Sequence, residues 1–331
     1  MGDTAALERA AEILKRGGLV AFPTETVYGL GADARSVQAV HKIFQAKNRP
    51  ADHPVIVHLS SADDVAQWAR ETPLPAQRLM QRFWPGPLTL ILKRAPGVID
   101  AVTGGQDTVG LRVPSHPLAQ ALLRAFGSGI AAPSANRFGR ISPTTAADVQ
   151  EELGNAVDVI LDGGACDVGI ESTIVDLSSG IPRLLRPGGI ARDELEAVMH
   201  AAVGAADSRS PRASGTLAAH YAPAVRMLLI EPEDLERALR DHANAADVAV
   251  LARRSQPAGV DVSLWRAGAL DARTYAHDLY ATLRELDRSG NALLIVEAPP
   301  AGAQWEAVRD RLQRAATGSG GAAIDDTEDA P

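Results

Sequence analysis

The sequence has few features of a membrane, secreted or metal-cluster protein. Its 331 residues include a single cysteine, Cys166, which excludes an intramolecular disulfide and a zinc–thiolate cluster. No apolar run approaches the roughly 20 residues that span a bilayer. The first residues also lack a basic segment followed by an apolar one, so we expect no secretory signal. These absences predict a cytoplasmic protein that does not use a membrane.

Basic charge and aromatic side chains are also scarce. The formal net charge is −8 at pH 7, whereas a dedicated nucleic-acid binder should carry a basic excess. Aromatic residues make up 4% of the chain, so the core must consist mainly of Leu, Val, Ile and Ala. The hydrophobic fraction of 46% and charged fraction of 22% are typical of a soluble globular protein. At roughly 150 residues per domain, the length suggests two domains.

The first 200 residues alternate between helical and strand-like patterns. Apolar residues at helical spacing predict helices over 4–16, 36–46, 116–126 and 144–153, and Ser61 followed by acidic residues predicts a helix start. Short apolar runs predict strands at 19–22, 54–59, 88–92, 109–113, 130–132, 157–161 and 173–177. The fold class is therefore α/β with a mixed sheet and not a strict βαβ alternation.

The remaining chain predicts a second, smaller domain. Residues 204–223 lose all periodicity and are rich in Ser, Ala, Gly and Pro, which indicates a linker. Strands at 225–230, 247–251 and 292–297 then alternate with helices at 232–243, 271–289 and 305–315, as in a small Rossmann-like domain with a parallel sheet. The predicted organisation is a larger α/β domain over 1–203, a linker over 204–223, a small α/β domain over 224–316 and a disordered tail over 317–331.

Polar segments follow several of these elements, where ligand sites form in open α/β sheets. Thr24 and Thr26 follow the first strand and could hold a polar ligand or satisfy their own backbone. Lys47 and Arg49 could face a polyphosphate or complement a helix dipole. Lys47 is one of four lysines against 29 arginines, which favours a specific use. Ser134, Asn136 and Ser142 could contact phosphate and ribose oxygens or make turns and an N-cap.

Single polar residues within apolar runs are further candidates. Arg112 lies in an otherwise apolar strand and needs a carboxylate, either from the protein or from a ligand. His58, at the end of a strand, is on its own more typical of a core histidine. The sequence contains no G-x-x-x-x-G-K-[ST] phosphate loop and no H-E-x-x-H motif.

Three motifs taken together resemble the YrdC-like family. They are FPTETVYGLG from Phe22, AKNRP from Ala46 and APSAN from Ala132. A fourth, HYAP from His220, is similar to the linker motif of the long-form L-threonylcarbamoyladenylate synthases, which carry an extra C-terminal α/β domain. The resemblance covers about residues 5–315.

The resemblance implies a fold and a reaction. The fold would be a twisted, open mixed sheet with a concave site. L-Threonine, bicarbonate and ATP would give L-threonylcarbamoyladenylate and pyrophosphate, with Mg²⁺ carried by the nucleotide phosphates and no protein-held metal. The product would pass to a separate tRNA threonylcarbamoyltransferase, in the first step of threonylcarbamoyl adenosine modification of tRNA. The synthase itself would have no direct tRNA requirement.

The resemblance also implies residue roles. Lys47 and Arg49 would be catalytic, binding phosphates and stabilising the departing pyrophosphate. The ATP-binding set would further include His53, Thr108, Ser134, Asn136, Ser142, Arg186 and Tyr221. The threonine-binding set would be Thr26, His58, Arg112, Ala132 and Ser172, with Arg112 pairing the substrate carboxylate. Tyr221 would act from a linker that covers the site as a lid.

Three alternatives compete with this function. A carbamoyl-adenylate-forming hydrogenase-maturation protein would need zinc-binding cysteine clusters, which the single Cys166 excludes. An RNA-binding module of the same fold is disfavoured by the acidic net charge. A small-molecule binder without catalysis is disfavoured by the presence of both the K-x-R and S-x-N residues.

Overall fold

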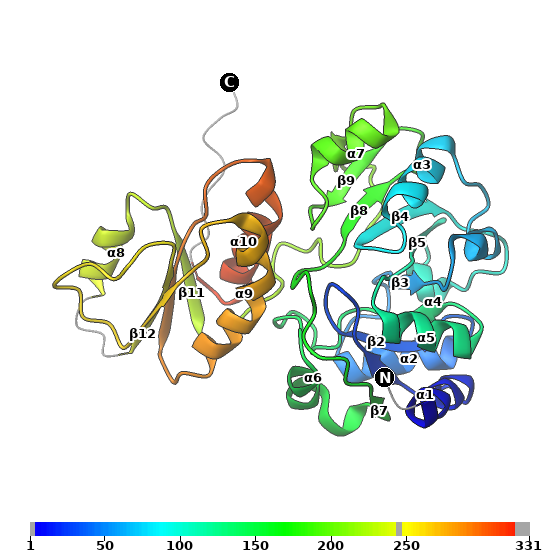
Figure 1. The fold of residues 1–331 in the computed structure, drawn as a ribbon, viewed down its shortest axis with the longest axis horizontal. Coiled ribbons are helices and arrows are strands. Elements are labelled where there is room, and N and C mark those ends of the chain that lie inside the picture. Colours follow the sequence, from blue (N-terminus) through cyan, green and yellow to red (C-terminus); the bar gives the residue numbers. More distant parts are fainter. Residues whose placement is uncertain (1–3, 243–246, 322–331) are drawn as a thin grey trace. The chain divides into compact units, whose positions relative to one another are not determined.

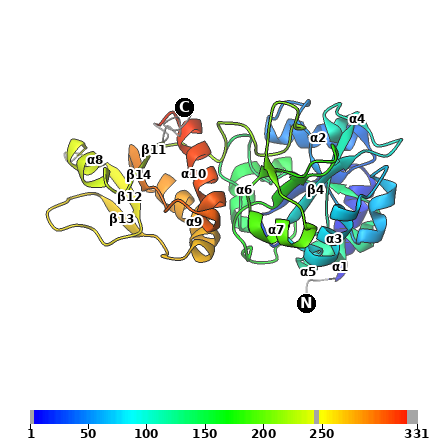
Figure 2. The same ribbon diagram turned by 90° about the horizontal axis from the view of Figure 1, so that it is seen from above.

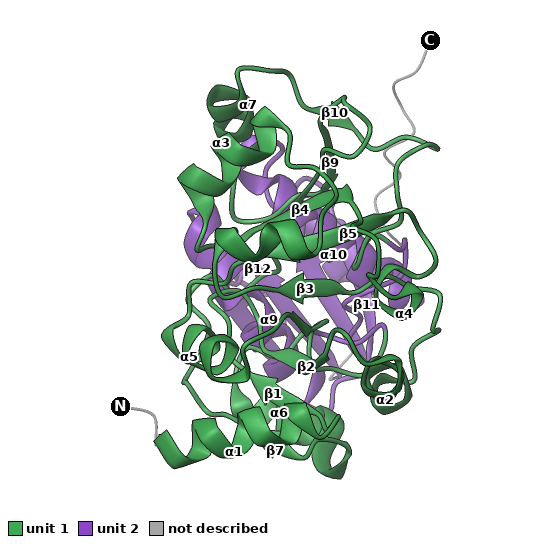
Figure 3. Cartoon of the chain, turned by 90° about the vertical axis from the view of Figure 1, so that its right-hand side faces the viewer, with its two compact units in different colours: residues 1–138, 142–216 green, residues 139–141, 217–331 purple. Residues whose placement is uncertain are grey.

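The chain forms two compact units in a computed structural model that describes residues 4–242 and 247–321 (Figures 1 and 3). The first unit comprises residues 1–138 and 142–216, and the second comprises residues 139–141 and 217–331. The division at residue 216 falls within the segment predicted as a linker. Within the described residues, no helix is both long and apolar enough to cross a membrane.

The first unit is built on one large sheet. Its strands are β1 (Val20–Phe22), β2 (Gly29–Asp33), β3 (Ile56–His58), β4 (Leu88–Lys93), β5 (Thr108–Arg112), β6 (Ile130–Ala131), β7 (Val159–Ile160), β8 (Thr173–Asp176), β9 (Arg183–Arg186) and β10 (Gly204–Ala205). Its helices are α1 (Thr4–Lys15), α2 (Val37–Lys47), α3 (Leu74–Phe83), α4 (Asp100–Thr103), α5 (Pro117–Phe126), α6 (Ala146–Leu153) and α7 (Arg192–Met199), with 3-10 turns at Ala62–Gln67 and Gly154–Ala156.

The strand order confirms the predicted mixed sheet. It runs β10-β9-β8-β4-β5-β3-β6-β2-β1-β7. β3 pairs with β5 in parallel, whereas β4 pairs with β5 and β3 pairs with β6 antiparallel. Parallel and antiparallel pairings together place strands from distant parts of the sequence side by side at the centre of the sheet.

Alternation along the strands divides the core between two faces. In β1, Ala21 belongs to the large cluster that includes Ile43 of α2. Its neighbours Val20 and Phe22 point the other way, into a cluster with residues of α1 and α5. Successive side chains of a strand alternate in this way, so one sheet can be covered on both faces.

The same alternation gathers polar residues on one face. Ile56 and His58 share a face of β3, and the register pairs them with Gly110 and Arg112 of β5. Ile56 belongs to a small apolar cluster with Ala213, whose segment therefore covers part of this face. Next to that cluster, the face carries the buried polar side chains described below.

The second unit is a small parallel sheet between helices. Its strands are β11 (Arg226–Ile230), β12 (Val248–Ala252), β13 (Leu264–Ala267) and β14 (Leu293–Glu297), in the order β11-β14-β12-β13. Its helices are α8 (Leu235–Asp241), α9 (Ala272–Asp287) and α10 (Glu306–Gly318), with a 3-10 turn at Ala303–Trp305. α8 lies on one face, and α9 and α10 lie on the other (Figure 2). The predicted parallel α/β architecture is confirmed.

Several predicted boundaries differ from the structure. The expected strand at 157–161 is reduced to β7, and α10 reaches Gly318, into the segment predicted as a tail. The rest of that tail, residues 322–331, lies outside the described residues, as does residue 243 at the end of a predicted helix.

Candidate functional site

Arg112 and Glu25 form a buried ion pair at the centre of the polar face. The guanidinium Nη2 lies 2.7 Å from the Oε1 of Glu25, and both side chains are at least nine-tenths buried. Nη1 donates to the hydroxyl of Thr26 at 2.8 Å, and Nε donates to the carbonyl of Gly86 at 3.3 Å. The carboxylate that the buried arginine requires is thus supplied by the protein in this structure.

The loop after β1 is held by its own threonines. The hydroxyl of Thr24 accepts hydrogen bonds from the backbone N–H groups of Thr26 and Val27 and donates to the carbonyl of Val27. Thr24 therefore satisfies its local backbone, as one of the two alternatives expects. The hydroxyl of Thr26 instead contacts both Arg112 and Thr24, at 2.8 Å each. The loop thereby places both Glu25 and Thr26 in contact with the guanidinium of Arg112.

His58 ends β3 directly beside Arg112. Its ring lies edge-on to Phe22, with centroids 6.0 Å apart, and its Nδ1 is buried without a hydrogen-bond partner. Burial, and then the positive charge of Arg112, lower the pKa of His58 to about 3. The imidazole is therefore neutral near pH 7.

The low pKa of His58 predicts a pH-dependent stability. Since the pKa in the folded state lies below the usual value near 6.5, the unfolded chain binds more protons between these two values. The free energy of unfolding should fall as the pH is lowered from about 6.5 towards 3. Replacing His58 by Phe should reduce this slope by up to about 1.4 kcal/mol per pH unit. Urea unfolding of both proteins between pH 6.5 and 4.5 measures the difference, and identical slopes would contradict it.

Lys47 lies at the end of α2, where Asn48 adopts a left-handed conformation (φ 51°) that ends the helix. The ammonium group reaches across to the carbonyls of Ser134, at 2.6 Å, and Asn136, at 2.5 Å. Burial, and then the charge of Arg49, lower the pKa of Lys47 well below its usual value. Two of its three N–H groups are used by these carbonyls, which leaves one for a ligand.

Arg49 and His53 meet at one aromatic ring. The guanidinium carbon of Arg49 lies 5.9 Å from the ring centre of Phe138, and the His53 ring lies edge-on to the same ring at 5.5 Å. Arg49 also donates to the carbonyl of Pro54 at 2.8 Å and lies 3.5 Å from the hydroxyl of Ser214. Burial, and then Arg49, lower the pKa of His53.

Arg186 connects Ser172 to the segment that follows β10. Its Nε and Nη2 donate to the carbonyl of Ser172, and Nη1 donates to the carbonyl of Ser214 at 2.8 Å. The Ser172 hydroxyl shares a 2.8 Å hydrogen bond with Thr89 of β4. Ser214 thus contacts both Arg49 and Arg186 within the first unit. The hydroxyl of Ser142 donates to Glu171, the residue before Ser172.

The remaining predicted site residues are Ala132, Thr108 and Tyr221. Ala132 donates its backbone N–H to the carbonyl of Ile56, so it contributes backbone to the polar face. Thr108 begins β5, at the opposite end of that strand from Arg112. Tyr221 belongs to the second unit, where its ring stacks on Tyr280 and lies under a buried arginine, Arg311. Its φ of 60° is rare for a residue with a side chain.

Comparison with known proteins matches both parts of the chain. A model for Sua5, YciO and YrdC proteins, described as "Telomere recombination", matches residues 12–188. The chain belongs to this Sua5/YciO/YrdC family. A second model, described as the threonylcarbamoyl-AMP synthase C-terminal domain, matches residues 190–317. The family resemblance predicted from the motifs is therefore confirmed.

Full-length relatives in the Sua5/YciO/YrdC family carry the same two parts. The threonylcarbamoyl-AMP synthase of Pyrococcus abyssi is 39% identical, over 92% of this chain and 92% of its own. That of Bacillus subtilis is 40% identical, over 94% and 93%. The crystal structure of P. abyssi Sua5 complexed with L-threonine superimposes with a TM-score of 0.87 at 36% identity, and covers 95% of this chain and 94% of its own.

Sequence reasoning missed three contacts of this Sua5/YciO/YrdC family member. Glu25 lies inside a motif that carries the resemblance, but its pairing with Arg112 was not foreseen. Glu25 is the one acid in its motif, and Arg112 is an isolated arginine in an apolar strand, and this complementarity of charge was the available signal. Ser214 and Glu171 had no such signal, because their contacts depend on how distant segments fold together.

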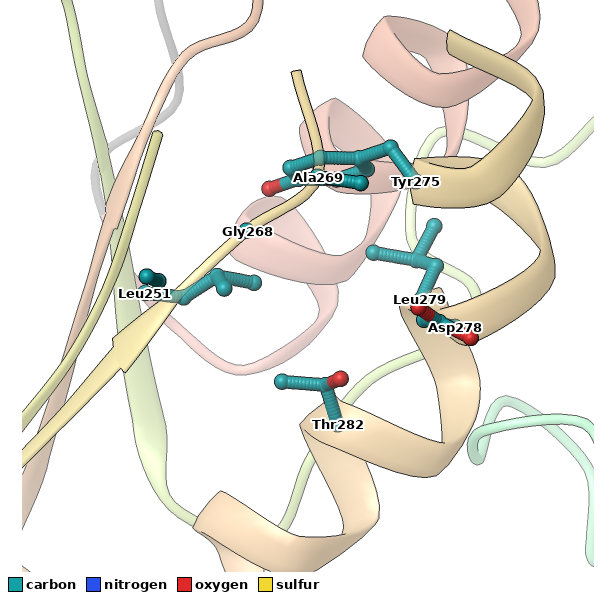
Figure 4. Close-up of a pocket in the computed structure, with 8 residues that line it drawn as sticks. Leu251, Gly268, Ala269, Tyr275, Asp278, Leu279 and Thr282 are labelled. Carbon is teal, nitrogen blue, oxygen red and sulfur yellow. The ribbon is translucent and has the colours of Figure 1, made fainter. Parts of the chain in front are cut away.

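Two cavities in the described part of the chain are lined by none of the predicted site residues. A cavity of about 40 Å³ lies in the second unit between the ends of β12 and β13 and helix α9, beneath Tyr275 (Figure 4). That volume suits a few water molecules at most. A shallow groove of about 710 Å³ in the first unit is lined by residues of α2 and the segments around Asp52 and Gly104.

Proposed function

We propose that this chain synthesises threonylcarbamoyl-AMP from L-threonine, bicarbonate and ATP, with release of pyrophosphate. Its relatives across most of its length are named threonylcarbamoyl-AMP synthase, and one is described in complex with L-threonine. The observation that carries the proposal is the gathering of buried cationic and hydroxyl side chains in one unit. Lys47 and Arg49 stand at the end of α2, Arg112 ends β5 and Arg186 ends β9. They lie with Thr26, Ser134 and Ser172 at their contacts.

The proposed chemistry proceeds through a carbamate. The threonine amine and bicarbonate condense to a carbamate with loss of water, and a carbamate oxygen attacks the α-phosphorus of ATP. The bond between the α-phosphorus and its bridging oxygen to the β-phosphorus breaks, and pyrophosphate leaves. Such a transfer needs positioning and charge stabilisation more than a protein nucleophile. A site rich in cations and hydroxyls, without a catalytic triad, suits that requirement.

The threonine would bind at the Arg112 end of the polar face. Arg112 would pair with the substrate carboxylate, and Thr26, His58 and Ser172 would surround the amino acid. Ala132 would contribute through its backbone. The neutral state of His58 supports this role, since an uncharged imidazole can accept or donate a hydrogen bond without adding charge.

The triphosphate would bind near Lys47 and Arg49. The remaining N–H of Lys47 and the fork of Arg49 would hold the phosphates and stabilise the negative charge that develops on pyrophosphate. Ser134 and Asn136, which Lys47 already contacts, would lie at the phosphate and ribose. Within the same unit, His53, Thr108, Ser142 and Arg186 would complete the ATP side.

Mg²⁺ would enter with the nucleotide. In the part of the chain that the structure describes, no three or more His, Cys, Asp or Glu side chains are grouped to hold a metal ion. The ion would be held by the phosphate oxygens of the nucleotide. Bound in that way, Mg²⁺ would neutralise phosphate charge, which lowers the cost of bringing the carbamate to ATP.

The remaining parts of the proposal concern the product. The adenylate would pass to a separate tRNA threonylcarbamoyltransferase, in the first step of threonylcarbamoyl adenosine modification of tRNA in the cytoplasm, and tRNA would not be needed for its synthesis. The names of the relatives do not favour the RNA-binding alternative. Pyrophosphate release from ATP, with threonine and bicarbonate each omitted in turn, tests the proposal.

A further inference from the structure

Glu25 and Arg112 each keep one buried atom that could bind a ligand. The carboxylate Oε2 of Glu25 accepts the backbone N–H of Ser115 at 3.0 Å, which fixes the side chain. The guanidinium is fixed by Thr26 and Gly86. Glu25 Oε1 and Arg112 Nη2 then lie 2.7 Å apart, but neither has a well-directed hydrogen bond, although both atoms are buried.

Buried charged atoms without directed hydrogen bonds indicate a ligand. Burying such atoms costs free energy unless they are paired and hydrogen-bonded. The rest of each side chain is well held, so these two atoms are not loosely placed. His58 Nδ1, on the strand beside Arg112, is an uncharged buried polar atom that also lacks a hydrogen-bond partner. Glu25 lies in the loop after β1, whereas His58 and Arg112 lie on the adjacent strands β3 and β5.

The chemistry of the pair matches an α-amino acid. A positive and a negative group lie side by side, with no net charge between them. The head of an amino acid carries a carboxylate and an ammonium group on one carbon, also with no net charge. We propose that Glu25 binds the ammonium group of the substrate while Arg112 binds its carboxylate, so that the pair selects a zwitterion. The inference rests on the proposed function, because it assumes that threonine binds at this site.

The surrounding groups support a neutral pocket around the pair. Burial, and then the charge of Glu25, raise the pKa of Cys166 to about 12, so the thiol is uncharged near neutral pH. His58 is also uncharged there. A ligand with only a carboxylate would meet Arg112 but would also be repelled by Glu25 at close range. An acid that lacks the ammonium group should therefore bind more weakly than threonine.

The test compares two ligands on the intact chain. Calorimetric titration would measure the dissociation constants of L-threonine and of 2,3-dihydroxybutanoate of the same configuration, in which a hydroxyl replaces the ammonium group. The unmodified chain should bind threonine at least about 10-fold more tightly, as expected for a charge-assisted hydrogen bond. In Glu25→Gln the preference should fall to about 3-fold or less, because threonine loses an ionic partner and the acid loses a repulsion.

Two further variants distinguish recognition from a structural role. Glu25→Asp keeps the charge and should retain part of the preference, whereas the exposed Glu8→Gln should leave it unchanged. A purely structural role of Glu25 would weaken both ligands in Glu25→Gln equally. That outcome, or equal binding of the two ligands by the unmodified chain, would overturn the inference. The comparison of the two ligands on the unmodified chain remains valid even if Glu25→Gln fails to fold. Failure of the unmodified chain to bind threonine at all would instead overturn the proposed function.

Discussion

Replacing Arg49 by alanine is expected to lower the rate of pyrophosphate release by about 100- to 1,000-fold, the effect of removing one preorganised group that stabilises charge in a transition state. In the proposed mechanism the loss falls mainly on kcat, because the charge on pyrophosphate develops as the bond to the α-phosphorus breaks. The fold should persist, since Arg49 lies outside the apolar clusters that form the core.

Two controls sharpen this prediction. Arg82, on the exposed face of α3, gives a matched substitution, and Arg82→Ala should leave the rate unchanged. Arg49→Lys keeps the charge but loses the planar fork, so it should recover part of the rate. A rate near that of the unmodified chain in Arg49→Ala would exclude Arg49 from the chemistry. Arg49 is a better subject than Lys47, because Lys47 also ties down the carbonyls of Ser134 and Asn136.

Replacing Arg112 by leucine is expected to remove threonine binding and to destabilise the fold together. The substitution removes the proposed partner of the substrate carboxylate and leaves Glu25 buried without its counter-charge. Breaking a buried ion pair in this way costs about 3–5 kcal/mol. The KM for threonine should rise by at least about 10- to 150-fold, the equivalent of a lost hydrogen bond to a charged group, while the KM for ATP changes little.

A double variant separates the two effects of losing Arg112. In Arg112→Leu with Glu25→Leu, no buried charge is left unpaired, so much of the lost unfolding free energy should return. Threonine binding should not return, because neither charged group is present. Urea unfolding and steady-state kinetics on the single and double variants measure both quantities. Recovery of threonine binding in the double variant would show that Arg112 acts only through stability.

The predictable parts of the fold were those with strong local patterns. The runs now seen as β4 and β8 are apolar enough to indicate buried strands by themselves. The edge strand β13 was missed because its four residues are half-buried or exposed and include Arg266. Helix α3 was missed as well, and it starts after Pro73 without a side-chain cap. β13 forms because tertiary packing supports a weak local signal, whereas α3 carries apolar residues at helical spacing that the prediction overlooked.

In the site, the sequence predicted which type of partner a residue needs but not which residue supplies it. The need of Arg112 for a carboxylate followed from its place in an apolar strand. Its choice of Glu25, among 41 acidic residues, depends on a loop and a strand 87 positions apart coming together. The contact of Lys47 with Ser134 and Asn136 likewise joins a helix end to a distant loop. The motifs therefore supply candidate residues, and the fold determines which of them are in contact.

In the proposed function, the first unit alone brings an amino acid and a triphosphate together for adenylate transfer. Pyrophosphate release from ATP, measured with the complete mixture and with threonine or bicarbonate omitted, tests it most directly. The account predicts release in the complete mixture and a loss of release when either substrate is left out. Equal release without threonine, or none in the complete mixture with Mg²⁺ present, would contradict it.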